Sequence, residues 1–525
     1  MNKVFIFDST LRDGAQGENV NFSVEDKFNV MKALDDFGID FIEAGNPASN
    51  PKDMEFFKKA EYFPPKHSKL VAFGSTRRKD VSCEEDVNLN ALADINVEYV
   101  SVFGKSWDMH ATDIIHTTLE ENLNMISDTI RYLIAKGKKV FFDAEHYFDG
   151  YKANPEYALS TLKAAEESGA EAVVLCDTNG GCFPDEIAEI VKIAVDYVNI
   201  PVGIHCHNDT GCAVANSIVA VKAGASQVQG TFTGIGERCG NTNLSTVIAN
   251  LQIKLGINCV PKENMTKLTQ VSRFISEICN IKLTSNMPYV GKSAFAHKGG
   301  MHADGVIKKS HSFEHISPET VGNKRNILLS DVAGRSAILQ RINEIAPELT
   351  KDSIETKTII DLIKDMEFKG YQYEAASASF ELIVKKYLGM TDNYFEINYF
   401  KIIGEKTGRM PNPSSAIVKL AVNGQSCIAA DEGDGPINAL DKALRQALTV
   451  FYPSIADVHL TDYKVRVIDG SAATAANVRV LIESTDGNDI WTTVGASTDV
   501  INASVIALLD SMEYKLMKDN SHKIS

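Results

Sequence analysis

Val4-Phe-Ile-Phe-Asp8-Ser-Thr-Leu-Arg12-Asp13-Gly14 is the stretch that decides the fold. Its first four residues form an apolar run typical of a short buried strand, and a charged turn follows them. This turn lacks the Gly-x-Gly-x-x-Gly pattern with which a doubly wound parallel sheet binds a nucleotide phosphate. The sequence therefore favours a closed parallel barrel, and a doubly wound open sheet is the alternative.

Similar apolar runs recur through the first half of the chain at intervals of about 30 residues, the period of βα units. Amphipathic segments separate them, such as 23–37, which starts at a serine with Asp26 three residues on, and 155–168, which ends at Gly169. Eight units in about 250 residues fit an α/β fold of the (β/α)8 TIM-barrel type. The eight runs are residues 4–7, 41–44, 70–73, 99–103, 140–142, 172–175, 202–204 and 227–232.

The eightfold rhythm stops near residue 285, which predicts three parts: a catalytic barrel over 1–284, a linker region over 285–392 and a C-terminal domain over 393–525. Residues 350–390 have a helical pattern. The last part alternates strand-like runs (416–422, 463–468, 478–484) with helices over 436–451 and 500–516, and 431–436 is expected to form a turn. Such an α+β module is typical of effector binding or dimerisation.

Composition excludes several classes of function. The formal net charge is −16 and no strongly basic stretch offsets it, which argues against binding to nucleic acid. No apolar run is long enough to span a bilayer, so no membrane association is expected. The nine cysteines include no Cys-x-x-Cys pair and are expected to be reduced and mostly buried, as in a cytoplasmic protein.

Ionisable and amide side chains gather where the predicted strands end. In TIM-barrel enzymes the chemistry lies at the C-terminal ends of the strands, so these residues are candidates for one site. They are Arg12, Asp13 and Gln16 after the first strand, Glu43 after the second, Glu145 after the fifth, Asp177 and Thr178 after the sixth, His205 and His207 at the seventh, and Glu237, Arg238 and Asn241 after the eighth.

His205 and His207 are the strongest metal-ligand candidates. Residues i and i+2 of a strand point to the same face, so both imidazoles would project together. With Asp13, and Asn241 as a further candidate, they would bind Mn²⁺, Mg²⁺ or Zn²⁺ and leave positions open for a chelating 2-oxo acid. The alternative is that both histidines only hydrogen-bond to neighbouring strands or loops.

Arg12 and His302 are candidates for other steps. Arg12 would stabilise an oxyanion beside the metal; alternatively, Arg12 and Asp13 form surface or interdomain salt bridges. His302, in a glycine-rich stretch over 295–305, is a candidate general acid or base, although an ordinary loop histidine is the simpler interpretation.

The motifs together resemble a known family, the Claisen-condensing metallolyase barrels, which include 2-isopropylmalate, homocitrate and citramalate synthases. The resemblance runs along nearly the whole chain, and several stretches look most like the citramalate-forming branch. The motifs are Asp8-Ser-Thr-Leu-Arg12-Asp13-Gly14-Ala-Gln16, Glu43, His205-Cys-His207-Asn208-Asp209, Gly-Glu237-Arg238-Cys-Gly-Asn241 and His297-Lys-Gly-Gly-Met-His302.

The resemblance implies a role for each candidate. Asp13, His205 and His207 would bind the metal, with Asn241 in or near its coordination shell. Arg12 would hold the 2-oxo acid, and Glu43 would orient Arg12 and Asp13. Thr178 would contact the substrate carboxylate, Glu145 would lie near the acetyl group, and His302 would act in acid–base steps, reaching across to a partner subunit.

The resemblance also implies the reaction and its partners. Acetyl-CoA would condense with pyruvate, and hydrolysis of the thioester would release CoA and (R)-citramalate for isoleucine synthesis. The chain would form a homodimer, and its C-terminal domain would bind a branched-chain amino acid, with isoleucine as the expected inhibitor. The alternatives are 2-oxoisovalerate or 2-oxoglutarate as substrate, a CoA-ester or retro-aldol lyase, and a catalytically inactive amino-acid sensor.

One departure from the family pattern concerns the choice of substrate. After Glu43 the chain reads Ala-Gly-Asn46-Pro47, where the citramalate-forming branch usually has an aromatic residue before the proline. The pocket around residues 43–47 is therefore expected to select the 2-oxo acid.

Overall fold

The computed structural model describes residues 3–297, 302, 305, 306, 308–327, 335–404, 414–468 and 476–524. The chain forms two compact units, one of Met1–Ala296 with Glu314–Asn326 and one of His297–Phe313 with Ile327–Ser525. The region predicted as a linker, 285–392, is thus divided between the two units. Residues 298–301 of the glycine- and histidine-rich stretch lie outside the described residues.

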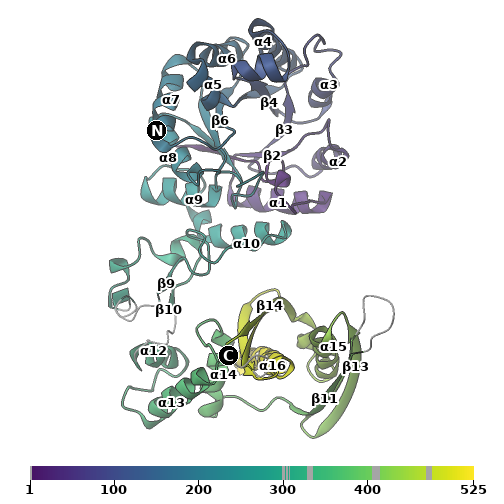
Figure 1. Cartoon of the computed structure of the whole chain (residues 1–525), viewed down its shortest axis with the longest axis vertical. Helices are drawn as coiled ribbons and strands as arrows, with labels where there is room; N and C mark the ends of the chain where they lie inside the picture. The colour runs from purple at the N-terminus through teal and green to yellow at the C-terminus, as the bar shows by residue number, and fades with distance from the viewer. Residues whose placement is uncertain are drawn as a thin grey trace. The chain divides into compact units, whose positions relative to one another are not determined.

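The first unit is a closed barrel of parallel strands surrounded by helices (Figure 1). Strand β1 pairs in parallel with both β2 and β8, which closes the sheet. The predicted TIM barrel is therefore confirmed, and the doubly wound sheet is excluded. The strands are β1 (Phe5–Asp8), β2 (Phe41–Gly45), β3 (Lys69–Ser75), β4 (Tyr99–Lys105), β5 (Lys139–Glu145), β6 (Ala172–Asp177), β7 (Val202–Cys206) and β8 (Gln227–Gly230).

Local sequence sets where the surrounding helices begin and end. Helix α1 starts at a capping box in which Ser23 accepts from the N–H of Asp26, and Gly38 ends it at a φ of 96°. The helices of this unit are α1 (Val24–Phe37), α2 (Pro51–Ala60), α3 (Val87–Asp94), α4 (Leu119–Ala135), α5 (Tyr147–Ala153), α6 (Pro155–Glu167), α7 (Pro184–Tyr197), α8 (Ala213–Ala223), α9 (Leu244–Ala249) and α10 (Leu268–Ile278).

The inside of the barrel changes from apolar to polar along its axis. Near the strand starts, Phe7, Phe41, Tyr99 and Phe141 pack together, with ring centroids 5.1 Å apart for Phe41 and Phe141 and 5.5 Å for Tyr99 and Phe141. Side chains two residues further along a strand point the same way, so Asp143 lies above this aromatic layer. The aromatic layer fills the N-terminal end of the barrel, and polar groups occupy the other end.

The second unit contains two antiparallel sheets of three strands, in the orders β11-β12-β13 and β14-β15-β16. Its strands are β11 (Glu396–Gly404), β12 (Ser414–Val422), β13 (Gln425–Gly433), β14 (His459–Val467), β15 (Val478–Thr485) and β16 (Ile490–Ser497). Its helices are α12 (Arg335–Ile345), α13 (Ile354–Phe368), α14 (Ser377–Tyr387), α15 (Pro436–Thr449) and α16 (Val500–Ile524), and short strands β9 (Ala296–His297) and β10 (Asn326–Ile327) lie at the changes between units.

The predicted α+β class of this C-terminal part is confirmed, with one correction. The expected turn at 431–436 is too long, because β13 continues to Gly433 before α15 begins. Within the described residues, no helix is long and apolar enough to cross a membrane.

Candidate active site

A cavity of about 230 Å³ opens at the C-terminal ends of the barrel strands. Its position agrees with the rule that barrel enzymes carry their chemistry at this end. It is lined by Arg12, Asp13, Gln16, Phe73, Phe103, Asp143, Glu145, Cys176, Thr178, His205, His207, Gln229 and Glu237. Most of the candidates that the sequence pointed to therefore share one cavity.

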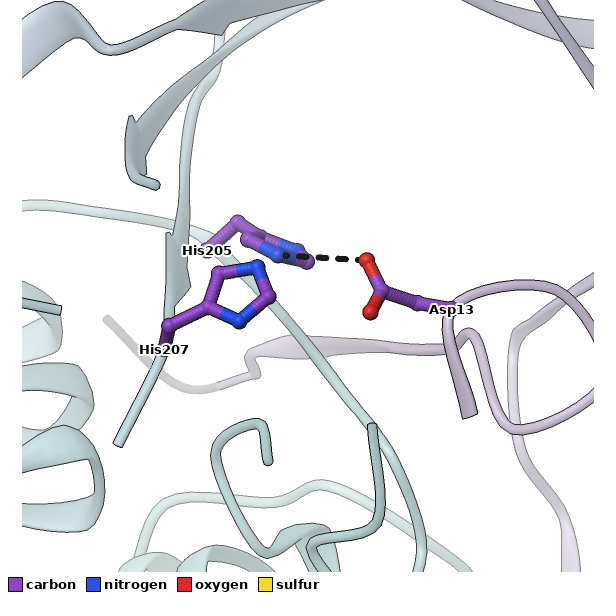
Figure 2. A group of neighbouring side chains, drawn as sticks. All are labelled: Asp13, His205 and His207. Carbon is purple, nitrogen blue, oxygen red and sulfur yellow. Dashed lines mark ion pairs between the residues drawn. The ribbon is translucent and has the colours of Figure 1, made fainter. Parts of the chain in front are cut away.

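Asp13, His205 and His207 form a potential metal-binding group (Figure 2). One ligand atom from each lies within 4.8 Å of the other two, and all three residues are buried. The carboxylate of Asp13 lies 3.7 Å from Nε2 of His205. Strand β7 supplies one histidine at its end and the other just beyond it, and the turn after β1 supplies the carboxylate.

The protonation states of these groups suit a metal ion. Burial raises the pKa of Asp13, but the charges of Arg12 and the two histidines outweigh burial and lower that pKa to about 2. Burial lowers the pKa of His205 to about 4 and also lowers the pKa of His207. At neutral pH the site thus offers a carboxylate and neutral imidazoles, the forms that bind divalent cations.

Three buried side-chain atoms at this site have no hydrogen-bond partner among the described residues. They are Nδ1 of His207, Oδ1 of Asn241 and Oε1 of Glu43. Buried polar atoms are normally paired, so an unpaired nitrogen and oxygen beside a carboxylate fit a missing ligand. The Asn241 amide nitrogen donates to Oδ1 of Asp13 at 2.8 Å. Asn241 thus holds Asp13 in place, and the donor set fits a divalent metal.

His205 is held by a chain of polar side chains inside the barrel. Its Nδ1 lies 3.2 Å from Oε1 of Gln229, and Nε2 of Gln229 donates to Asp143 at 3.1 Å. Asp143 also accepts from the Ser101 hydroxyl at 2.7 Å. Because Gln229 uses its NH₂ group on Asp143, its oxygen faces His205 and accepts a hydrogen bond from Nδ1–H. That leaves the Nε2 lone pair of His205 directed to the metal site.

Arg12 lies between two carboxylates and an aromatic ring. It donates from Nε to Glu43 at 2.7 Å and from Nη1 to Asp13 at 2.9 Å, and its guanidinium stacks 3.8 Å from the centroid of Phe73. The Ser9 hydroxyl donates to the same Glu43 oxygen at 2.6 Å. The salt bridge considered as an alternative therefore exists, but it is buried inside the site and not on the surface.

Thr178 and Glu145 lie on another side of the cavity. The Thr178 hydroxyl oxygen accepts from the backbone N–H of His146 at 2.9 Å, and its carbonyl accepts from Arg238 at 2.7 Å. Glu145 forms an ion pair with Lys105. Thr178 is fixed by two contacts, while its hydroxyl hydrogen remains available to a ligand in the cavity.

Six predicted residues are not among those that line the cavity: Glu43, Asn46, Asp177, Arg238, Asn241 and His302. Oδ1 of Asn46 accepts from the backbone N–H groups of Ala48 at 3.0 Å and Ser49 at 3.3 Å, so its side chain caps its own turn. Asn46 is not among the residues that line the cavity, and the expectation that residues 43–47 select the 2-oxo acid stays a prediction. His302 belongs to the second unit, is exposed, and lies with its ring tilted against Phe313, with the ring centroids 4.7 Å apart.

Several residues of this site carried no motif. Phe73, Phe103 and Cys176 line the cavity from within strands, and Asp143 and Gln229 support His205. The alternation of side chains along strands could have identified these residues from the sequence. Asp143 lies two residues before Glu145 in β5, so both must point into the barrel.

Family models divide the chain into three matches. The HMGL-like model matches residues 3–275, the homocitrate synthase post-HMGL domain-like model matches 289–370, and the LeuA allosteric (dimerisation) domain matches 374–516. The first match covers the barrel with all of its cavity residues, and the last covers both antiparallel sheets.

Curated proteins match along nearly the full length. The chain is 53% identical to an (R)-citramalate synthase of Aquifex aeolicus, over 99% of each protein. It is 47% identical to an (R)-citramalate synthase of Synechocystis sp., over 98% of this chain and 96% of that protein. A probable 2-isopropylmalate synthase of Methanopyrus kandleri is 34% identical over 97% of each. The likeness thus spans barrel, connecting region and C-terminal domain alike.

Proposed function

The chain belongs to the HMGL-like family and to its (R)-citramalate synthases, and we propose on that premise that it condenses acetyl-CoA with pyruvate and releases (R)-citramalate and CoA. It is an acyltransferase that converts the acyl group to alkyl on transfer. One observation supports this activity most directly: the buried group of Asp13, His205 and His207 opens on a cavity that also contains Arg12.

The walls of the cavity favour pyruvate over larger or more acidic 2-oxo acids. Phe73 and Phe103 stack with centroids 5.4 Å apart and offer an apolar wall to a methyl group. Among the described lining residues Arg12 is the one cation, and it already faces Glu43 and Asp13. A second carboxylate, as in 2-oxoglutarate, would find no partner on this wall.

The residues of the chain would divide the binding of the substrate between them. A divalent metal held by Asp13, His205 and His207 would supply Lewis acidity to the keto group. Arg12 would donate to the oxygen on which negative charge develops. Thr178 would donate its hydroxyl hydrogen to the substrate carboxylate. Glu43, which accepts from Arg12 and Ser9, keeps the guanidinium in this position.

The acetyl group would lie towards Glu145, one of the carboxylates that line the cavity. Glu145 pairs with Lys105 and would remove a proton or activate water as a carboxylate. His302 would serve acid–base steps from the second unit of a partner subunit in a homodimer. His302→Ala should then lower kcat, and mixed dimers with a barrel-inactive variant should regain activity.

The C-terminal domain would bind a regulatory amino acid, with isoleucine as the inhibitor of a cytoplasmic homodimer. The match to the LeuA allosteric (dimerisation) domain supports regulation and dimerisation. Inhibition assays with isoleucine, leucine and valine test the effector directly. Equal insensitivity to all three would refute the regulatory assignment.

A thiol-release assay with acetyl-CoA and a panel of 2-oxo acids tests the main proposal. Pyruvate should give the highest kcat/KM, ahead of 2-oxoisovalerate and 2-oxoglutarate, and the product should be (R)-citramalate by chiral chromatography. Faster turnover of 2-oxoisovalerate would assign the chain to isopropylmalate formation instead.

Chelation tests the proposed metal. A chelator should abolish CoA release, and Mn²⁺ or Mg²⁺ should restore it, whereas His207→Ala should stay inactive at any concentration of metal. Full activity of the chelated enzyme would exclude the metal from the reaction.

A further inference from the structure

Strand β2 contains a bulge next to the site. In its pairing with β3, Glu43 lies opposite Val71 and Gly45 lies opposite Ala72, so Ala44 is an extra residue. A bulge of this kind turns the neighbouring side chain to a new direction. Here the neighbour is Glu43, which accepts from Arg12. The bulge therefore determines where Glu43 meets Arg12.

A buried lysine from helix α1 fastens this bulge. Nζ of Lys27 donates to the carbonyl of Ala44 at 2.6 Å, to the carbonyl of Leu11 at 3.1 Å and to Oδ1 of Asp53 at 2.5 Å. An ammonium group has three hydrogens, so all are used. Leu11 directly precedes Arg12, and Ala44 directly follows Glu43. One ammonium group thus ties the turn that carries Arg12 to the strand that carries Glu43.

Asp53 of helix α2 completes the clamp. Its Oδ2 accepts from the backbone N–H of Asn46 at 2.9 Å, just past the bulge. A Cβ at position 45 would lie 2.2 Å from the same Oδ2, and Gly45 has a φ of 140°. Only glycine permits this approach. The carboxylate and the bulge are therefore fitted to each other.

A purely stabilising role explains this arrangement poorly. Replacing a buried ion pair by apolar residues of similar volume is often neutral or stabilising, so such a pair is weak evidence for a contribution to stability. Lys27 and Asp53 form hydrogen bonds with the backbone that flanks Arg12 and Glu43. Placement of these two side chains is what the clamp provides.

We propose that Lys27 and Asp53 are positioning residues for the reaction, acting through the bulge of β2 to hold Glu43 against Arg12. The inference rests on the proposed function, because it is measured as CoA release from acetyl-CoA and pyruvate. Neither residue is among those that line the cavity.

Lys27→Met is the first test. It should lower kcat at least 30-fold while the KM for acetyl-CoA stays within twofold, and Lys27→Arg should recover part of the loss. Asp35→Asn is the matched control, since Asp35 is a buried residue of α1 that accepts from the backbone of Lys66, His67 and Ser68 away from the site. It should lower the Tm with kcat within twofold. An equal loss of kcat in both variants would refute the proposal.

A double-mutant cycle with Glu43→Gln makes the test independent of general damage. If Lys27 acts through Glu43, adding Lys27→Met to Glu43→Gln should change kcat by less than threefold; multiplication of the two losses would overturn the inference. If Lys27→Met does not fold, Asp53→Asn, which keeps an acceptor oxygen, replaces it in the cycle. An inactive wild-type enzyme would refute the proposed function instead, so the two failures are distinguishable.

Discussion

His205 depends on neighbours that never touch the proposed metal. Gln229 accepts a hydrogen bond from Nδ1 of the His205 ring, and Asp143 orients Gln229. These two side chains together set which nitrogen of His205 carries the proton. Partners of this kind commonly change metal affinity by about 10-fold to 100-fold when they are removed. Metal affinity therefore depends on supporting residues as well as on the residues that would bind the metal.

Replacing Gln229 by leucine should weaken metal binding by about 10-fold to 100-fold, because the imidazole loses the contact that fixes its proton and orientation. Titration of the chelated protein with Mn²⁺ in a calorimeter measures the affinity without any assay of turnover. Gln227→Leu is the control, since Gln227 is a buried glutamine on the same face of β8. Unchanged affinity in Gln229→Leu would remove Gln229 from the site.

Asp510 should make the second unit less stable as the pH rises. Burial raises its pKa from 3.8 to about 6, although the hydroxyl of Ser379 donates to it. The folded state then binds the proton more tightly than the unfolded state, so stability falls between about pH 4 and pH 6 and stays lower above. Two units of pKa amount to about 3 kcal/mol at most, and partial exposure of the side chain reduces this figure.

Asp510→Asn should remove this dependence. The variant should gain Tm relative to wild type on going from pH 4.5 to pH 7.5 in thermal melts, since its side chain carries no charge to bury. A difference in Tm that stays constant across this range would show that Asp510 titrates normally.

Sequence could identify the residues whose chemistry is specific to a strand end or turn. Asp13, His205 and His207 carry ligand atoms in a recognisable order, and the structure brings them together. Gln229 and Asp143 sit inside strands, where a polar residue has no motif of its own. Nothing in the sequence around Asn46 shows that its oxygen caps its own turn.

At the level of elements, the helix caps give separable contributions to stability. Ser23→Ala removes the acceptor for the N–H of Asp26 and should cost about 1 kcal/mol, or about 2 °C in the Tm of the barrel. Ser160→Ala is the comparison, because Ser160 lies within α6 and its hydroxyl only donates to the carbonyl of Tyr157. Differential scanning calorimetry of both variants measures the effect. An equal change in Tm in both variants would show that the Ser23 cap does not stabilise the barrel.

The same scale explains which strands the sequence predicts. Seven of the eight barrel strands contain buried apolar runs, because helices cover the outside of the sheet and side chains fill its inside. Strand β8 is the exception, with the buried glutamines Gln227 and Gln229. Strands β11, β13 and β16 were not predicted. The first two have many exposed positions and polar residues among apolar ones, and β13 ends on Asp431, Glu432 and Gly433, a composition typical of turns. Partly exposed strands dilute the apolar signal.

For the whole molecule, the division into two compact units predicts two thermal transitions. Mn²⁺ should raise only the transition of the barrel, by about 2.7 kcal/mol of stabilisation at 100 times its Kd, because its ligands lie in the first unit. Isoleucine should raise only the other transition. Calorimetric scans with each ligand measure both. A single transition that either ligand shifts would contradict the assignment of the two sites to separate units.

The aromatic layer at the strand starts also affects the order in which substrates bind and products leave. Phe7, Phe41, Tyr99 and Phe141 fill the barrel near the strand starts, so reactants would reach the cavity from the C-terminal ends of the strands. Two reactants that enter from the same side would bind in a fixed order. The small keto acid would bind first, because the larger thioester would then cover it. Products must leave in the reverse order, CoA ahead of the new acid. Four rings far from the chemistry would thereby impose a compulsory sequence on the kinetics of the enzyme.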